Sequence, residues 1–250
     1  MTEKTPNGTF SGRNRRGAIA IAVCLGLVAL WGGLRSLAPA PPDGVEVVAG
    51  LGDIETGLAR LTEASGVEDP SLTSIVEAGP GESDLDLLYI GTPECGHCRD
   101  FVSAPQDDPD GLAALAALAR AQGLSFAYRP AALSVHGAAF AAIEACLDTK
   151  PSGPEGLQAL YASFETYGDA LAAAGDRPLA DALLAVFREL GGADMACVSA
   201  AYDRELRVIG SLDAAFPGQG VPRFYVAARG GVFRIVGARD IVNRVSDLVE

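Results

Sequence analysis

The sequence predicts an α/β fold with a large helical insertion, preceded by one N-terminal transmembrane helix. Residues 85–130 alternate a short apolar strand, a helix and a second strand, which predicts a parallel β-α-β unit with a right-handed crossover. Two further strands and a closing helix end the chain. The residues between these two parts, about 134–216, show almost only helical periodicity and form the expected insertion.

An uncharged apolar segment near the N-terminus predicts the membrane anchor. Residues 17–34 carry no charged side chain, and Arg13, Arg15 and Arg16 precede them. A segment of this length just spans a hydrocarbon core of about 30 Å. Because the arginines hold the N-terminal side in the cytoplasm, we expect a single-pass protein of the inner membrane with its C-terminal domain in the periplasm or extracytoplasmic space.

The same segment also fits a signal peptide that is cleaved, with Ala38-Pro39-Ala40 as a poor cleavage site. Both interpretations place the remainder outside the cytoplasm, where disulfides persist. The expected organisation is a cytoplasmic tail (1–16), an anchor or signal peptide (17–37), a linker (38–50) and a folded domain (51–250).

The chain is strongly acidic. It has 19 Lys and Arg against 32 Asp and Glu, a formal net charge of −13, and Glu3 is the only carboxylate before the apolar segment. Because a negative surface repels phosphate groups, we expect no nucleic-acid partner.

Periodicity and turn residues predict the elements of the folded domain in order. They are a helix over 51–65, a short helix or turn over 70–78, a strand over 85–91, a helix over 112–122 that Gly123 ends, and a strand over 124–130. Helices follow over 137–147, 154–174, 178–190 and 194–216. Strands over 222–227 and 232–236 flank Arg229-Gly230-Gly231, an antiparallel hairpin signal, and a helix over 238–249 closes the chain.

The motif Cys95-Gly96-His97-Cys98 follows the strand over 85–91 and begins a helical pattern. A thiol in the first turn of a helix faces unpaired N–H groups and the positive end of the helix dipole, which stabilise its thiolate. The second cysteine lies one turn further on the same face, where it can attack a mixed disulfide formed on the first. We therefore assign Cys95 as the nucleophile and Cys98 as the resolving thiol.

His97 and Glu94 flank the nucleophile with opposite effects. His97 can donate to the Cys95 sulfur, and its cationic form adds to the field of the helix, so we count it with the two cysteines as catalytic. A more stable thiolate makes the disulfide more oxidising, nearer to isomerases and oxidases than to thioredoxin. Glu94 acts in the other direction, because it places a negative charge beside the nucleophile.

Haem and zinc are the two alternatives for the motif. A haem attachment site would need a histidine where the chain has Arg99. A zinc site would need two more ligands, and the candidates Cys146, Cys197 and His136 form no second Cys-x-x-Cys pair. The sequence has no glycine-rich phosphate loop either, so we expect no metal and no cofactor.

The chain has three cysteines outside the motif. Cys24 lies inside the apolar segment, so Cys146 and Cys197 are the two that remain in the folded domain. An even remainder in an exported domain predicts a structural disulfide between them. The alternative is a pair of buried free thiols, since free cysteine is often buried.

These features together resemble the DsbA-type branch of the thioredoxin fold. The strand before Cys-Gly-His-Cys, the helical insertion and Val221-Pro222 at the start of a terminal β-hairpin carry the resemblance, which covers roughly residues 80–250. It implies that the folded domain is thioredoxin-like. It also implies that the Val221–Pro222 bond is cis, that Pro222 packs against the active-site disulfide and that Val221 contacts substrate backbone, so both residues are expected to bind substrate.

The chain departs from this family at two positions. The family often has a buried acid six residues before the nucleophile, which handles the proton of the resolving thiol, and Tyr89 stands there. Glu94 replaces an apolar or aromatic residue. Because a buried tyrosine is a poor proton acceptor at neutral pH, we expect either slower resolution or the use of water or another acid.

The expected function is that of a membrane-anchored periplasmic thiol:disulfide oxidoreductase, which oxidises or isomerises cysteines of exported polypeptides through a Cys95–Cys98 redox disulfide. The resemblance implies a membrane redox partner that recycles the pair. One alternative is a tethered thiol reductase of the cytochrome-maturation type, which runs the same chemistry backwards. The other is a redox-inactive binding or chaperone module.

Overall fold

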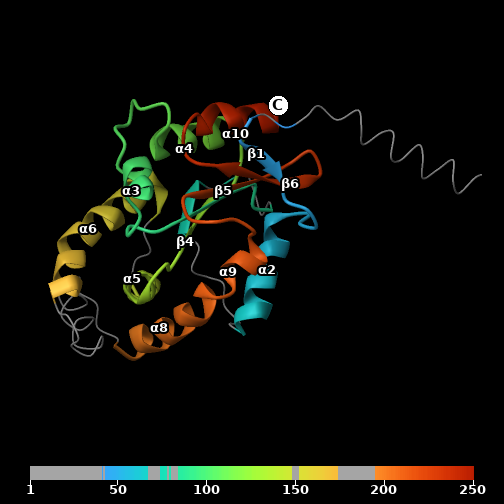
Figure 1. The fold of residues 1–250 in the computed structure, drawn as a ribbon. Coiled ribbons are helices and arrows are strands. Elements are labelled where there is room, and N and C mark those ends of the chain that lie inside the picture. The colour runs from blue at the N-terminus through green and yellow to red at the C-terminus, as the bar shows by residue number, and fades with distance from the viewer. Residues whose placement is uncertain are drawn as a thin grey trace, which may run out of the picture. The chain divides into compact units, whose positions relative to one another are not determined.

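A six-stranded mixed sheet with the strand order β1-β6-β5-β3-β4-β2 forms the centre of the fold (Figure 1). The computed structural model describes residues 43–66, 74–77, 84–147, 152–173 and 195–250, together with Pro41 and Gly79. The strands are β1 (Val45–Val47), β2 (Ser74–Glu77), β3 (Leu87–Gly91), β4 (Phe126–Pro130), β5 (Arg223–Ala228) and β6 (Gly231–Val236). The helices are α2 (Ile54–Ser65), α3 (Gly96–Val102), α4 (Leu112–Gln122), α5 (Val135–Ala145), α6 (Gly153–Ala173), α8 (Met195–Ile209), α9 (Leu212–Ala215) and α10 (Ile241–Val249).

The centre of the sheet contains the predicted β-α-β unit. Strand β3 runs parallel to β4, and α3 and α4 lie between them in the chain, which confirms the prediction. On its other side β3 pairs antiparallel with β5, which forms the predicted hairpin with β6. Every residue of β3 and β4 is buried, as expected for strands that are covered on both faces. The fold is of the predicted α/β class, with a mixed sheet and helices.

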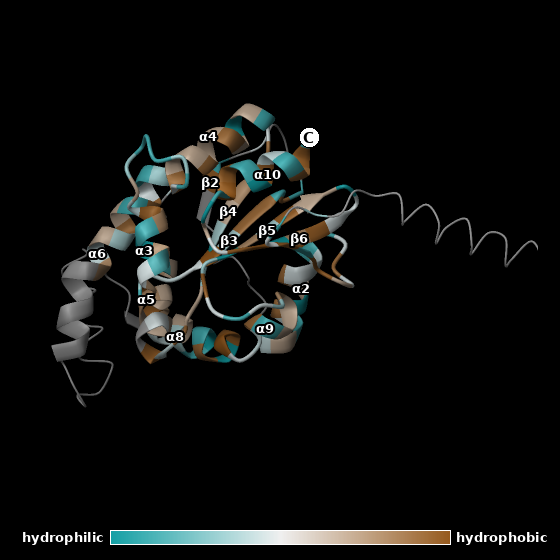
Figure 2. Ribbon diagram, turned by 45° about the horizontal axis from the view of Figure 1, so that its top comes forward, coloured by the Kyte–Doolittle hydropathy of each residue, from teal (hydrophilic) through white to brown (hydrophobic). Residues whose placement is uncertain are grey.

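Helices cover both faces of the sheet, because successive side chains of a strand point to opposite faces. Leu87 and Tyr89 of β3 belong to a core that α3, α4, α6 and α10 complete. Leu88 and Ile90 belong to a second core, which α2, α8 and α9 complete. Figure 2 shows α4 and α10 on one side of the sheet and α2 and α9 on the other.

Left-handed backbone conformations define two of the predicted turns. Gly123 ends α4 with φ 69°, and its N–H donates to the carbonyl of Arg120, as a helix C-cap requires. Arg229 and Gly230, with φ 51° and 75°, join β5 to β6 in the tight turn that the sequence predicts.

The helical insertion contains α5, α6, α8 and α9, and α5 packs against α8. A disulfide between Cys146 and Cys197, whose Cα atoms are 6.0 Å apart, joins the end of α5 to α8. The structure therefore contains the cross-link that the cysteine count predicts. The helix expected over 178–190 lies outside the described residues.

Two segments differ from the sequence expectation. Residues 74–77, expected in a short helix or turn, form β2 and pair antiparallel with β4. Val45–Val47, expected within the linker over 38–50, form β1 and pair antiparallel with β6. Both are short strands at the two edges of the sheet. A strand of three or four residues is too short to show a period of its own, so its partner in the sheet decides its structure.

In the part of the chain that the structure describes, no helix is long and apolar enough to cross a membrane. The tail over 1–16 and the anchor over 17–37 lie outside that part, so both stay predictions from the sequence.

Candidate active site

The Cys95–Cys98 pair lies where β3 passes into α3. After β3, a turn is closed by the N–H of Cys95, which donates to the carbonyl of Thr92 at 3.1 Å. Cys95 is the N-cap residue of α3, and its own carbonyl accepts from the N–H of Arg99 at 3.0 Å. Cys98 follows in the first turn of the helix. The sequence spacing thus places both thiols at the N-terminus of one helix, as predicted.

The two thiols differ in their access to solvent. Cys95 is half-buried, whereas Cys98 is 0% exposed, and the structure shows both as free thiols. Burial raises the pKa of the Cys98 thiol to about 12, although hydrogen bonds from the Thr92 backbone and the Tyr89 side chain act against the shift. A molecule from solution therefore meets Cys95 first, and Cys98 is available only to Cys95 or to a partner bonded to it.

The second predicted part of the site lies against the nucleophile. The Cys95 thiol donates to the carbonyl oxygen of Val221 at 3.3 Å, across 126 positions of sequence. The Val221–Pro222 peptide bond is cis, as the resemblance implies. Because Pro222 directly precedes β5, the antiparallel pairing of β5 with β3 brings this loop to the end of β3 where the cysteines lie.

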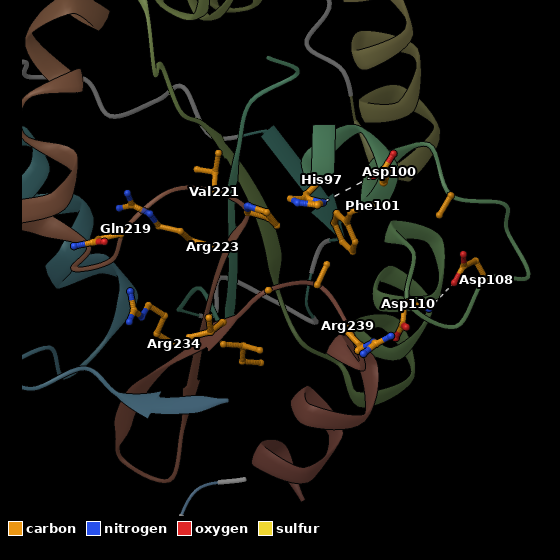
Figure 3. Close-up of a pocket in the computed structure, with 16 residues that line it drawn as sticks. His97, Asp100, Phe101, Asp108, Asp110, Gln219, Val221, Arg223, Arg234 and Arg239 are labelled. Carbon is orange, nitrogen blue, oxygen red and sulfur yellow. Dashed lines mark hydrogen bonds and ion pairs between the residues drawn. The ribbon is translucent and has the colours of Figure 1, made fainter. Parts of the chain in front are cut away.

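An open pocket of about 540 Å³ is lined by His97, which stands between the two cysteines in the sequence, and by Val221, whose carbonyl accepts from Cys95 (Figure 3). His97 and Phe101 of α3 line it from one side and Val221 lines it from another, and Pro222 is also among the lining residues. The remaining lining residues are Asp100, Ala104, Asp108, Asp110, Gln219, Arg223, Arg234, Ile235, Val236, Gly237, Ala238 and Arg239. Apolar side chains such as Phe101 and Val221 line it together with charged ones such as Asp100 and Arg223, a mixture that suits a segment of another polypeptide.

The imidazole of His97 faces Asp100. Its side chain is 88% exposed, and Nδ1 is 4.0 Å from Oδ2 of Asp100, one helical turn further along α3 (Figure 3). The sequence predicts that His97 acts on the Cys95 sulfur, and Asp100 was not predicted as part of the site. The i, i+3 spacing of the two residues on a helix was the signal for this pair.

Glu94 connects the loop before Cys95 to the helical insertion through a hydrogen bond. Oγ of Ser134, directly before α5, donates to Oε1 of Glu94. Gly137 leaves room for the carboxylate, because a Cβ at that position would lie 2.1 Å from Oε2 of Glu94. Ser134 and Gly137 were not predicted as neighbours of the site, since nothing local in the sequence links them to Glu94.

A cluster of three tyrosines lies behind Cys98. Tyr89 of β3, Tyr128 of β4 and Tyr161 of α6 are all buried, and the hydroxyls of Tyr89 and Tyr161 are 3.1 Å apart. Tyr128 donates to the carbonyl of Gly91 at 3.3 Å. Burial raises the pKa of all three hydroxyls well above 10, so they stay neutral. Three neutral tyrosine side chains therefore lie near the resolving thiol, and only Tyr89 was predicted from the sequence.

The zinc alternative loses two of its candidate ligands, because Cys146 and Cys197 are bonded to each other. Among the residues that the structure describes, no three His, Cys, Asp or Glu side chains are grouped to hold a metal ion.

No protein-family model and no curated protein matches the sequence. Among solved structures, the chain is similar to the DsbA disulfide interchange protein of Klebsiella pneumoniae, with 15% identity and a TM-score of 0.40 over 70% of this chain and 94% of that one. It is similar to the catalytic domain of Proteus mirabilis ScsC, with 12% identity and a TM-score of 0.38 over 78% and 98%. It is also similar to BcfH of Salmonella enterica Typhimurium, with 16% identity and a TM-score of 0.42 over 94% and 96%.

These structural neighbours belong to the DsbA type that the sequence resembles. At such identities and with TM-scores below 0.5, these likenesses establish neither the family nor the activity of this chain. The chemistry open to the site follows from its own residues: a dithiol with one accessible and one buried sulfur can exchange with disulfides, which is the reaction of thiol:disulfide oxidoreductases.

Proposed function

We propose that this chain is a periplasmic thiol:disulfide oxidoreductase that oxidises or isomerises cysteines of exported polypeptides. The observation that carries the proposal is the difference between the two thiols. Cys95 lies half-buried against the carbonyl of Val221, which lines an open pocket, and Cys98 is fully buried one helical turn further on. Such a pair lets a client reach one sulfur while the other is kept for exchange within the protein.

Oxidation starts from the Cys95–Cys98 disulfide. A client thiolate attacks Sγ of Cys95, a new client–Cys95 disulfide forms, and the bond between the two protein sulfurs breaks. Its electron pair leaves on Sγ of Cys98, which takes up a proton. A second client thiolate then attacks the client sulfur of the mixed disulfide, so the client gains its disulfide and Cys95 leaves as a thiolate. The client has lost two electrons, and the protein dithiol holds them.

A segment of the client polypeptide is proposed to bind in this pocket. Because the Val221 carbonyl lies within hydrogen-bond distance of the Cys95 sulfur, a segment bonded to Cys95 passes directly over Val221 and Pro222. Backbone contacts of this kind suit an enzyme with many clients, since they do not depend on the client's side chains.

The proposed location is the inner membrane, with residues 17–37 as an uncleaved anchor and the catalytic domain in the periplasm. The Cys146–Cys197 disulfide supports an oxidising compartment. A membrane redox partner would take the two electrons after each turnover. Membrane fractionation and the mass of the mature chain test the anchor: we expect a membrane-bound chain of full length, and a soluble chain that begins after residue 37 would contradict it.

The test of activity is the oxidation of reduced, unfolded ribonuclease in a glutathione buffer. We expect the full chain to accelerate the recovery of ribonuclease activity and the Cys95→Ser variant to have no effect. The matched variant Cys98→Ser keeps the accessible nucleophile but cannot resolve, so we expect it to accumulate as a mixed disulfide with the client. Equal activity of Cys95→Ser and the wild type would refute the proposal in favour of a binding module.

The second candidate function is that of a thiol reductase, in which the same site catalyses the exchange reaction in the opposite direction and reduces client disulfides. Glu94 favours that direction, since a negative charge beside Cys95 opposes formation of its thiolate. The reduction potential separates the two directions: about −120 to −180 mV indicates oxidation or isomerisation, and about −270 mV indicates reduction.

A further inference from the structure

We propose that Arg223 is a positioning residue of the active site, which holds the loop over residues 216–221 so that the backbone of Val221 faces the Cys95 sulfur and the client segment. The inference rests on the disulfide exchange proposed above. It adds the group that keeps the client-binding backbone in place before a client arrives.

The loop between α9 and β5 needs support from outside its own sequence. It runs Phe216-Pro217-Gly218-Gln219-Gly220-Val221, in which the proline lacks an N–H and Gly220 takes a left-handed backbone with φ 68°. A segment with two glycines in six residues loses much conformational freedom when it becomes ordered. Side chains of neighbouring elements must therefore hold its carbonyl groups.

The guanidinium of Arg223 supplies these donors. Nε donates to the carbonyl of Gly220 at 2.5 Å, and Nη1 donates to the carbonyl of Phe216 at 3.0 Å, so one side chain bonds both ends of the loop. Nη2 lies 2.6 Å from Oδ1 of Asp213 in α9. Because a guanidinium is a rigid plane with donors in fixed directions, these three contacts determine the orientation of the loop as well as its distance from β5.

Arg223 is itself fixed in the sheet that leads to the cysteines. It is the first residue of β5, pairs with Ile90 of β3 and is only 5% exposed. The loop packs directly against it, since a Cβ at Gly218 would lie 3.3 Å from Cδ of Arg223. Tyr225, two residues further on the same face of β5, donates to the carbonyl of Pro217 at 3.0 Å. The loop is thus bonded to the strand that pairs with β3, and β3 leads into the cysteine motif.

This anchoring determines where Val221 lies. Gly220 accepts from Arg223, and the next carbonyl along the chain, that of Val221, accepts from the Cys95 thiol at 3.3 Å. The contacts of Arg223 described above include neither cysteine, so they do not depend on whether the pair is reduced or oxidised. A client therefore meets a backbone that is already in place, and its affinity is not reduced by the entropy of ordering the loop.

The test compares two thiols that attack the oxidised full chain: reduced, unfolded ribonuclease, and 2-mercaptoethanol, which has no peptide backbone to bind the loop. Acid quenching followed by alkylation measures the second-order rate constant of each. We expect Arg223→Met to lower the rate constant for ribonuclease by about tenfold, because the lost hydrogen bonds leave a loop that the client must order. The rate constant for 2-mercaptoethanol should stay within about twofold of that of the wild type, since this thiol makes no use of the loop.

The ratio of the two rate constants separates positioning from stability, because a loss of folded protein lowers both by the same factor. The matched control is Arg129→Met, which removes a buried arginine of β4 whose ion pair with Glu205 lies outside the loop. We expect this control to keep the ratio of the wild type. A ratio for Arg223→Met within about twofold of the ratio for Arg129→Met would overturn the inference.

Arg223→Lys tests the geometry of the guanidinium rather than its charge. Lysine keeps the positive charge but has a single nitrogen, which cannot reach both loop carbonyls and Asp213 in the same directions. We expect the ratio to fall by about threefold or more. If Arg223→Met does not fold, an unchanged ratio in Arg223→Lys overturns the inference instead. Failure of the wild type to oxidise ribonuclease would overturn the proposed function itself.

Discussion

Cys98 should ionise far above the range of an ordinary thiol. Burial moves its pKa from 9.0 to about 12. At pH 10, a thiol with a pKa of about 12 is about 1% ionised, whereas one at the ordinary value is about 90% ionised. The experiment is a pH titration of the Cys95→Ser variant, in which the disulfide partner of Cys98 is removed and Cys98 stays in place. The two ionised fractions at pH 10 differ enough to decide whether the Cys98 thiol is buried or accessible.

Thiolate absorbance in the ultraviolet reports this ionisation. The matched control is Cys95→Ser/Cys98→Ala, whose titration is subtracted because it contains Cys24 and the same tyrosines. We expect almost no Cys98 thiolate in the difference curve at pH 10. Half-ionisation of Cys98 below that pH would refute the burial of the resolving thiol.

The same shift predicts how stability depends on pH. The pKa of Cys98 is higher in the folded state than in the unfolded state, so its contribution is fully present below pH 9.0 and is lost as pH rises toward about 12. Between pH 8 and pH 10 we expect the free energy of unfolding of Cys95→Ser to fall by about 1.4 kcal/mol more than that of Cys95→Ser/Cys98→Ala. Urea unfolding without reductant measures this difference, and parallel curves for the two variants would contradict it.

Two further predictions concern the helical insertion. Replacing Cys146 and Cys197 together with alanine removes a cross-link across 51 positions, and the chain-entropy relation gives a loss of about 4 kcal/mol in the free energy of unfolding. A urea titration that shows a loss below about 1 kcal/mol would contradict this estimate. The buried ion pair of Arg129 on β4 and Glu205 on α8, with Nη2 3.4 Å from Oε2, should cost about 3–5 kcal/mol when either partner alone is replaced, as in Arg129→Met or Glu205→Leu. The double variant should cost less than either single one, and strictly additive losses in the same titration would show that the two charges are independent.

The parts of the fold that the sequence predicts well are those whose signals are local. The strand before the cysteines, the end of α4 at Gly123 and the β5–β6 turn each depend on a period or on a turn residue within a few positions. The Cys95–Cys98 pair is also predicted from a local signal, because the motif consists of four consecutive residues. The partnership of Cys95 with Val221 needed the resemblance, since 126 positions separate them.

The parts that the sequence does not predict depend on tertiary contacts. Strands β1 and β2 exist because β6 and β4 have free edges for them. Tyr161 lies 72 positions after Tyr89, in a helix whose own pattern gives no sign that it reaches the active site. Glu94 likewise meets Ser134 only after the insertion has folded back onto the loop. No periodicity within the sequence contains such information.

The most direct test of the central claim is a redox titration of the full chain in glutathione buffers, in which thiols are counted by alkylation after acid quenching and unfolding. We expect two thiols to appear together in a single two-electron transition, at a potential between about −180 and −120 mV, and to be absent as a pair in Cys95→Ser. A thiol count that stays constant across every buffer would contradict the claim that Cys95 and Cys98 exchange as a redox pair.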